Sequence, residues 1–204
     1  MIPRTLFLPE HDLFRDAFRT FVEREVAPHH GRWEDQGHVD RELWLKAGVA
    51  GFLCPTMPEA YGGSGVNRLY SAIILEELAG AGASGPGFSL HSDIVAPYVL
   101  NYGDEHQKRT WLPQMARGEK IGAIAMTEPG AGSDLQAVKT TAVEDGDAYV
   151  INGSKTFITN GFLCDFVIVV AKTGDPSGGA DQMSLILVEA DREGFSKEQP
   201  FKKV

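Results

Sequence analysis

The spacing of apolar residues along the chain changes near residue 118. Up to that point apolar residues recur every three or four positions, the spacing of one face of a helix. This spacing predicts helices over 9–26, after Asp40, over 67–78, over 88–102 and over 104–117. Beyond it apolar and polar residues alternate, which predicts short strands over 121–127, 140–144, 148–151, 155–158, 166–171 and 184–189.

Capping and turn residues support these boundaries. Asp40 and Asn67 are predicted N-caps, and Asp104 opens a sequence with the spacing of a capping box. Pro28 is expected to end the first helix and Pro97 to kink a later one. Tight turns between strands are indicated by three dipeptides that favour positive φ: Asp145-Gly146, Asn152-Gly153 and Asn160-Gly161.

The order of these elements predicts an α+β fold. An all-helical N-terminal domain is expected over 1–118 and an antiparallel β domain over 119–204. Residues 196–204 resemble the start of a further strand pair, and a sheet ending there would expose unpaired backbone. We therefore expect the β domain to be truncated.

Composition and charge exclude several classes of protein. The net charge of −9 and the scattered Lys and Arg argue against a nucleic-acid partner. The longest apolar stretch, 163–171, contains Asp165 and is shorter than the roughly 20 residues of a membrane span. No secretory signal is evident, and Cys54 and Cys164 are expected to be free thiols, so a cytoplasmic location is predicted. The histidines lack ligand spacing, so no metal site is predicted.

A strand that runs into a glycine-rich loop is the first candidate for chemistry. Residues 123–134 are Ala-Ile-Ala-Met-Thr-Glu-Pro-Gly-Ala-Gly-Ser-Asp. Gly130 and Gly132 allow backbone N–H groups to turn inward and form a concavity, while Thr127 and Ser133 add hydroxyl donors. The segment lacks the features of a P-loop or a dinucleotide fingerprint. An ordinary turn between strands is the alternative interpretation.

The second candidate covers residues 152–161, Asn-Gly-Ser-Lys-Thr-Phe-Ile-Thr-Asn-Gly. Alternation along a strand would place Phe157 and Thr159 on one face. An aromatic ring beside a hydroxyl could cover a flat heterocycle and donate to its edge. The alternative is a hairpin strand with Phe157 in the core.

Together, the two segments resemble the acyl-CoA dehydrogenase family, and the resemblance runs along the whole chain, closest to the long-chain branch. It implies a helical domain, a central β domain and a C-terminal four-helix bundle that is absent here. It also implies FAD as cofactor. The cofactor-binding residues would be Ile124, Ala125, Met126, Thr127, Gly132, Ser133, Phe157, Ile158 and Thr159.

The resemblance also implies roles for some of these residues. The backbone of 124–127 would face the flavin pyrimidine edge, and Ser133 would lie near the FAD pyrophosphate and bind the CoA moiety. Phe157 would cover the flavin ring, and Thr159 would direct its hydroxyl towards N5. Many members have Trp in place of Phe157, so this chain keeps the stacking face and loses the indole N–H.

No catalytic residue is assigned, because family members place the catalytic Glu in the C-terminal domain, beyond residue 204. Glu76 and Glu77 are expected to mark the polar face of their helix, and Glu128 to shape its loop. Gly85 and Gly87 lie near the expected acyl tunnel, where missing side chains would leave room for a long chain. An ordinary loop is the alternative there.

The resemblance implies α,β-dehydrogenation of medium- to long-chain acyl-CoA thioesters. Electrons would pass to an electron-transferring flavoprotein, and the complete protein would be a homotetramer. Two alternatives remain open: an acyl-CoA oxidase or flavin monooxygenase on the same fold, and a non-catalytic half-length binding or scaffold chain that needs a partner.

Overall fold

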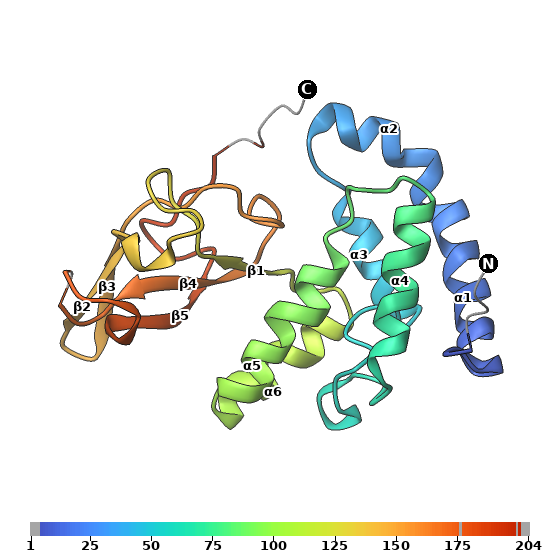
Figure 1. Ribbon diagram of the computed structural model, residues 1–204, viewed down its shortest axis with the longest axis horizontal. Helices are drawn as coiled ribbons and strands as arrows, with labels where there is room; N and C mark the ends of the chain where they lie inside the picture. The colour runs from blue at the N-terminus through green and yellow to red at the C-terminus, as the bar shows by residue number, and fades with distance from the viewer. Residues whose placement is uncertain (1–4, 176, 199, 201–204) are drawn as a thin grey trace. The chain divides into compact units, whose positions relative to one another are not determined.

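A computed structural model describes residues 5–175, 177–198 and 200 (Figure 1). The chain divides into two compact units, a helical one that runs to Ile121 and a β unit, Gly122–Glu198. The predicted order of a helical part followed by a β part is confirmed. The boundary after residue 118 stays a prediction.

The helical unit contains six α-helices and two π-helical segments among its described residues. In chain order they are α1 (Pro9–Phe21), the π segment Val22–Val26, α2 (Ala27–Gln36), α3 (Arg41–Val49), α4 (Arg68–Gly80), the π segment Leu90–Val95, α5 (Ala96–Tyr102) and α6 (Glu105–Ala116). The predicted end at Pro28 is wrong, because the helical path continues into α2. Pro28 lies in the first turn of α2, directly after the π segment, a position that proline tolerates.

Two of the three predicted caps form. The Asn67 side chain accepts from the Leu69 N–H at 2.9 Å, and Asp104 and Gln107 bond each other's backbone N–H groups in a capping box. Asp40 precedes α3 but makes no side-chain cap bond. Its carboxylate binds Arg32 instead, and this contact lowers the pKa of Asp40.

Aromatic and aliphatic side chains fill the centre of the helical unit. Trp44 of α3 is fully buried and meets Phe88 edge-on, with ring centroids 4.9 Å apart. Gly118 follows α6 at φ +70°, and a Cβ there would lie 2.0 Å from the Trp44 carbonyl oxygen. Only glycine fits so close to α3, so this position fixes how the chain turns after α6.

The β unit is a mixed sheet with β4 (Phe166–Lys172) at its centre. β4 pairs antiparallel with β5 (Met183–Glu189) and parallel with β1 (Gly122–Ala125). β2 (Thr141–Asp145) joins β4 through Thr141 and Lys172 and forms a hairpin with β3 (Ala148–Asn152). The predicted antiparallel sheet is therefore only partly right. The long connection between β1 and β4 permits parallel pairing, which alternation of side chains does not reveal.

All seven residues of β4 are buried, as its central position requires. Five of the six predicted strands form, with ends that differ by a few residues. The strand predicted over 155–158 does not form. Among the described helices, none has the length and apolar character needed to cross a membrane.

Candidate functional site

The first candidate segment leaves the sheet at the end of β1. Ile124 and Ala125 are buried against β4, in register with Ile168 and Val169. Met126 and Thr127, which follow, are half-buried. The chain then closes a tight loop in which Glu128 and Ala131 exchange backbone hydrogen bonds of 2.9 and 3.1 Å. Gly132 and Ser133 continue it as exposed residues.

The carboxylate of Glu128, which is only 7% exposed, fixes the loop through hydrogen bonds. One oxygen accepts from the Lys139 N–H at 2.7 Å. The other accepts from the Thr140 N–H and hydroxyl and from Lys155 Nζ. Burial acts to raise the pKa of Glu128, but these donors outweigh it and hold the pKa at about 2. The prediction that Glu128 shapes its loop is confirmed, because both carboxylate oxygens accept hydrogen bonds from residues that surround the loop.

Lys155 joins the second candidate segment to the first. Its Nζ lies 2.9 Å from Glu128 Oε1 and 3.0 Å from the carbonyl oxygen of Met126. The next residue, Thr156, donates its N–H to the Thr127 carbonyl at 3.0 Å. The two sequence motifs, separated by about twenty residues of chain, therefore lie side by side.

The second segment is a loop, contrary to the predicted strand over 155–158. Gly153 passes so close to Thr140 that a Cβ would lie 2.2 Å from the threonine hydroxyl. Phe157 then adopts φ +57° and Asn160 φ +64°, values that an extended strand cannot contain. The inward turn of Lys155 and these left-handed residues break the alternation that the sequence suggested.

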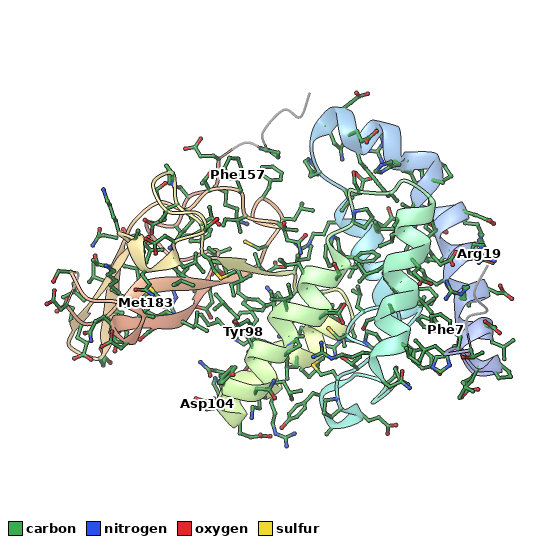
Figure 2. The ribbon with its side chains drawn as sticks, viewed as in Figure 1. Phe7, Arg19, Tyr98, Asp104, Phe157 and Met183 are labelled. Carbon is green, nitrogen blue, oxygen red and sulfur yellow. The ribbon has the colours of Figure 1, made fainter. Side chains whose placement is uncertain are left out.

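This backbone path exposes the two side chains that the motif singled out. Ile158 packs against the apolar core of the β unit. Its neighbours do not: Phe157 is 75% exposed and Thr159 is also exposed (Figure 2). The alternative prediction of a core Phe157 is therefore wrong. A large exposed ring beside a residue anchored on the core provides an apolar surface for a ligand.

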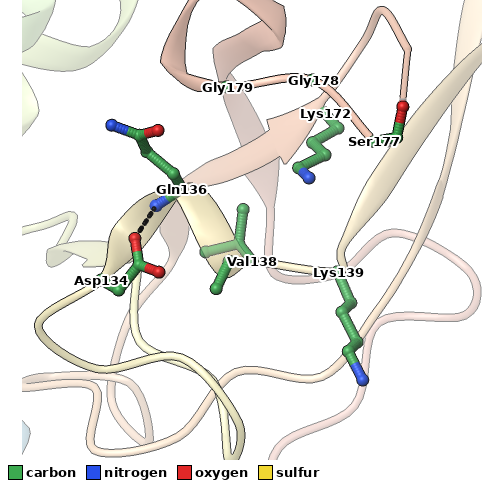
Figure 3. A pocket seen from close by; sticks show the side chains of 9 residues that line it. Asp134, Gln136, Val138, Lys139, Lys172, Ser177, Gly178 and Gly179 are labelled. Carbon is green, nitrogen blue, oxygen red and sulfur yellow. Dashed lines mark hydrogen bonds between the residues drawn. The ribbon is translucent and has the colours of Figure 1, made fainter.

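A cavity of about 580 Å³ lies beside the continuation of the first segment (Figure 3). Asp134, Lys139 and Ser177 contribute to its lining, together with Lys172 at the end of β4. Lys172 is only 7% exposed. Two lysines on a hollow of this size suit an anionic group.

The other candidates lie in the helical unit. Glu76 and Glu77, predicted to mark the polar face of α4, are partly buried, and each binds Arg15 at 2.8 Å. Glu77 also binds Arg19 of α1 at 2.8 Å, and this hydrogen bond lowers the pKa of Glu77. Both carboxylates thus hold α1 against α4.

Gly85 is exposed and Gly87 is half-buried. A Cβ at Gly85 would lie 3.1 Å from Cγ1 of Val39, so a larger residue would need a small shift of the Val39 side chain. A role for either glycine in substrate binding stays a prediction. The described residues include no group of three or more His, Cys, Asp or Glu side chains suited to a metal.

Two known protein-domain families together match almost the whole chain. Residues 8–119 match the acyl-CoA dehydrogenase N-terminal domain, and residues 123–204 match the acyl-CoA dehydrogenase middle domain. The chain belongs to the acyl-CoA dehydrogenase family. Within this family the two matched domains correspond to the helical part and the β part described above.

Individual acyl-CoA dehydrogenases are similar over nearly the whole chain. It is 52% identical to the mitochondrial long-chain specific acyl-CoA dehydrogenase of Sus scrofa, covering 98% of this chain and 47% of that protein. The crystal structure of an acyl-CoA dehydrogenase from Geobacillus kaustophilus is 50% identical with a TM-score of 0.90, covering 94% and 51% of the two chains. A glutaryl-CoA dehydrogenase from Mycobacterium smegmatis, solved in complex with FADH2, is 30% identical with a TM-score of 0.83, covering 94% and 48%. The chain thus spans about half the length of these acyl-CoA dehydrogenases.

Sequence reasoning found both acyl-CoA dehydrogenase motifs but missed what joins them. Lys155 stood inside the second motif without an assigned role, and Thr140 and Gly153 were placed only in a strand and a turn. The one available signal was the presence of an acidic residue, Glu128, in the first motif and a basic residue, Lys155, in the second. Their contact is a long-range one that no local pattern contains.

Proposed function

We propose that this chain supplies the flavin and substrate contacts for FAD-dependent α,β-dehydrogenation of acyl-CoA thioesters. Medium to long acyl chains are the proposed substrates, since the similar protein from Sus scrofa is named as long-chain specific. The observation that carries the proposal is the direct bonding of segment 126–128 to segment 155–156. It brings together the two sets of residues that would hold a flavin ring.

The residues present fit an isoalloxazine, which is flat, apolar on its faces and polar at its edge. Phe157 offers an exposed ring for one face. Thr127 offers donors for the edge: among the described residues neither its N–H nor its hydroxyl has a hydrogen-bond partner. A half-buried residue with two unused donors is suited to a polar ligand.

Each group in this site would have a separate task. Bound FAD would accept the hydride that leaves the β carbon while a base removes the α proton. The donors of Thr127 would stabilise negative charge at the pyrimidine edge, and Thr159 would place its hydroxyl towards the reacting edge of the ring. Ser133 would bind near the pyrophosphate and the CoA moiety. We assign no base, because Glu128, Glu76 and Glu77 are all committed to structural ion pairs.

The cavity beside Asp134 is proposed to receive an anionic part of CoA. It begins next to Ser133 in the sequence and is lined by Lys139 and Lys172. Phosphate groups are the strongest anions of CoA, and lysine binds them as a point charge. This assignment lies wholly within the β unit.

Partners and location follow from the proposed reaction and stay proposals. Electrons would leave through an electron-transferring flavoprotein, and the complete protein would be a homotetramer. The cytoplasmic location predicted from the sequence is also untested, and the similar protein from Sus scrofa is named as mitochondrial.

The test is the visible spectrum of the purified intact protein under anaerobic conditions. We expect a yellow protein whose flavin absorbance is bleached by acyl-CoA of medium or long chain. A colourless protein that takes up no FAD would favour the non-catalytic binding chain. Rapid recolouring by oxygen after bleaching would favour the oxidase or monooxygenase.

A further inference from the structure

A buried polar cluster underlies the segment from Gly153 to Thr159, and it joins three separate pieces of chain. The Glu128 carboxylate comes from the first loop, its donors Lys139 and Thr140 from the residues around the start of β2, and Lys155 from the second loop. The side chains of Glu128 and Lys155 are 7% and 11% exposed. This buried ion pair bridges two loops, one of which was predicted to be a strand, and it calls for a specific reason.

Stability alone is a weak reason for such a pair. Removing two charges from water is costly, and apolar side chains of similar volume often stabilise a fold as well or better. An apolar cluster has no hydrogen-bond donor and so cannot fix the orientation of a peptide plane through its carbonyl group. Lys155 Nζ does this, because it donates to the Met126 carbonyl at 3.0 Å.

The direction of the Thr127 N–H follows from that contact. The Met126 carbonyl and the Thr127 N–H belong to one planar trans peptide, so they point in opposite directions. Lys155 holds the carbonyl towards the buried cluster, which turns the Thr127 N–H away from it. That N–H is the donor without a partner among the described residues.

The same lysine also fixes the position of the second loop. Thr156 donates to the Thr127 carbonyl, so residues 155 and 156 are bonded to two consecutive carbonyls of the first segment. Phe157 follows directly at φ +57°. The spacing between the Thr127 donor and the Phe157 ring is therefore set by the Lys155 side chain together with the Thr156 N–H, and Glu128 holds the Lys155 ammonium group.

We infer that Glu128 and Lys155 are positioning residues for the flavin ring. Lys155 aims the Thr127 N–H at the ring edge and, together with the Thr156 N–H, sets the distance from that edge to Phe157; Glu128 holds the Lys155 ammonium group in place. This inference rests on the proposed function. Neither residue touches the flavin in this account, so neither is a catalytic residue.

The experiment measures FAD affinity in the intact protein, by quenching of flavin fluorescence, for the wild type, Lys155→Met and Lys155→Arg. Thr173→Val is the matched control, because it removes a 2.7 Å side-chain hydrogen bond to Ser184 elsewhere in the same unit. All variants are compared at a temperature at which circular dichroism shows each to be folded. We expect about tenfold weaker binding for Lys155→Met, partial rescue by Lys155→Arg and a change below about twofold for Thr173→Val.

A second readout separates positioning from general loosening. The midpoint potential of the bound flavin should shift in Lys155→Met, since a donor at the ring edge has moved, and should not shift in Thr173→Val. If Lys155→Met does not fold, Thr140→Val removes one donor to Glu128 and keeps Lys155, and about threefold weaker FAD binding is expected. If Lys155→Met folds and keeps the wild-type FAD affinity and midpoint potential, the positioning role is overturned and the proposed function stands. The same holds for Thr140→Val where it replaces Lys155→Met. A wild type that binds no FAD overturns the proposed function, and the inference with it.

Discussion

Replacing Glu128 by Gln removes one charge from a buried carboxylate that accepts hydrogen bonds from Lys139, Thr140 and Lys155. The amide keeps the shape and one acceptor oxygen. Its NH2 group, however, would face donors, and the Lys155 ammonium would lose its buried counter-charge. We therefore expect Glu128→Gln to destabilise the β unit at neutral pH, by an amount that the pKa of Glu128 allows us to work out.

The pKa of Glu128 is about 2 in the fold, compared with 4.5 for an unperturbed glutamate. At about 1.36 kcal/mol per pKa unit, ionisation contributes roughly 3 kcal/mol to the free energy of unfolding at pH 7. Because the folded pKa is the lower one, this stabilisation is complete above pH 4.5 and is lost as the pH falls through 2. At pH 3 less than half of this stabilisation remains.

The assay is hydrogen exchange of the wild type and Glu128→Gln at pH 7 and pH 3, corrected for intrinsic rates. Peptides that cover 139–156 report the affected region, and peptides from α6 serve as an internal reference. Glu144→Gln is the control variant, since the Glu144 carboxylate is exposed and accepts only from Tyr149 among the contacts described. The difference between wild type and Glu128→Gln should be roughly 3 kcal/mol at pH 7 and fall by about half or more at pH 3. Equal differences at the two pH values would refute the assigned ionisation.

Three further outcomes are expected. Gly153→Ala should lower the free energy of unfolding by about 1–3 kcal/mol, because the added Cβ would overlap Thr140. Gly130→Ala should change this free energy little, since the space around Gly130 is open, and thermal unfolding compares the two variants. Phe157→Ala should leave the apo protein as stable as before within about 0.5 kcal/mol, since the ring is exposed, yet weaken FAD binding in a fluorescence titration; a marked loss of apo stability would contradict this. Gly87→Leu should reduce activity on long acyl chains more than on short ones, and an equal loss across chain lengths would remove Gly87 from the tunnel.

Local signals were sufficient for most of the fold. The capping box at Asp104 and the cap at Asn67 form as their side chains predict, because both depend on groups within three residues. The Asp145-Gly146 turn likewise connects the β2–β3 hairpin, with Gly146 at φ +66°. These are contacts in which sequence distance and spatial distance are both short.

The errors have a different origin. Pro28 was expected to end a helix, but it lies in the first turn of α2, directly after a π-helical segment. Parallel pairing of β1 with β4 leaves no trace in either strand alone. Residues 155–158 alternate like a strand, and only the buried contact of Lys155 with Glu128 shows why they form a loop.

In the candidate site, too, local features could be predicted from the sequence and long-range contacts could not. Both motifs were evident from their residue types, and the resemblance to a family supplied roles for Thr127, Phe157 and Thr159. What holds these residues in place was not evident, since Lys155 acts across the fold on Met126 and Glu128. Supporting contacts of this kind are set by three-dimensional neighbours, which a single sequence does not specify.

The central claim is that segments 124–127 and 157–159 together form the site for a flavin ring. The most direct test is amide hydrogen exchange of the intact protein with and without FAD, resolved to short peptides. FAD is expected to slow exchange in both segments, including the Thr127 N–H, with a smaller effect on the β2–β3 hairpin. FAD binding that leaves both segments unprotected and slows exchange elsewhere would contradict it.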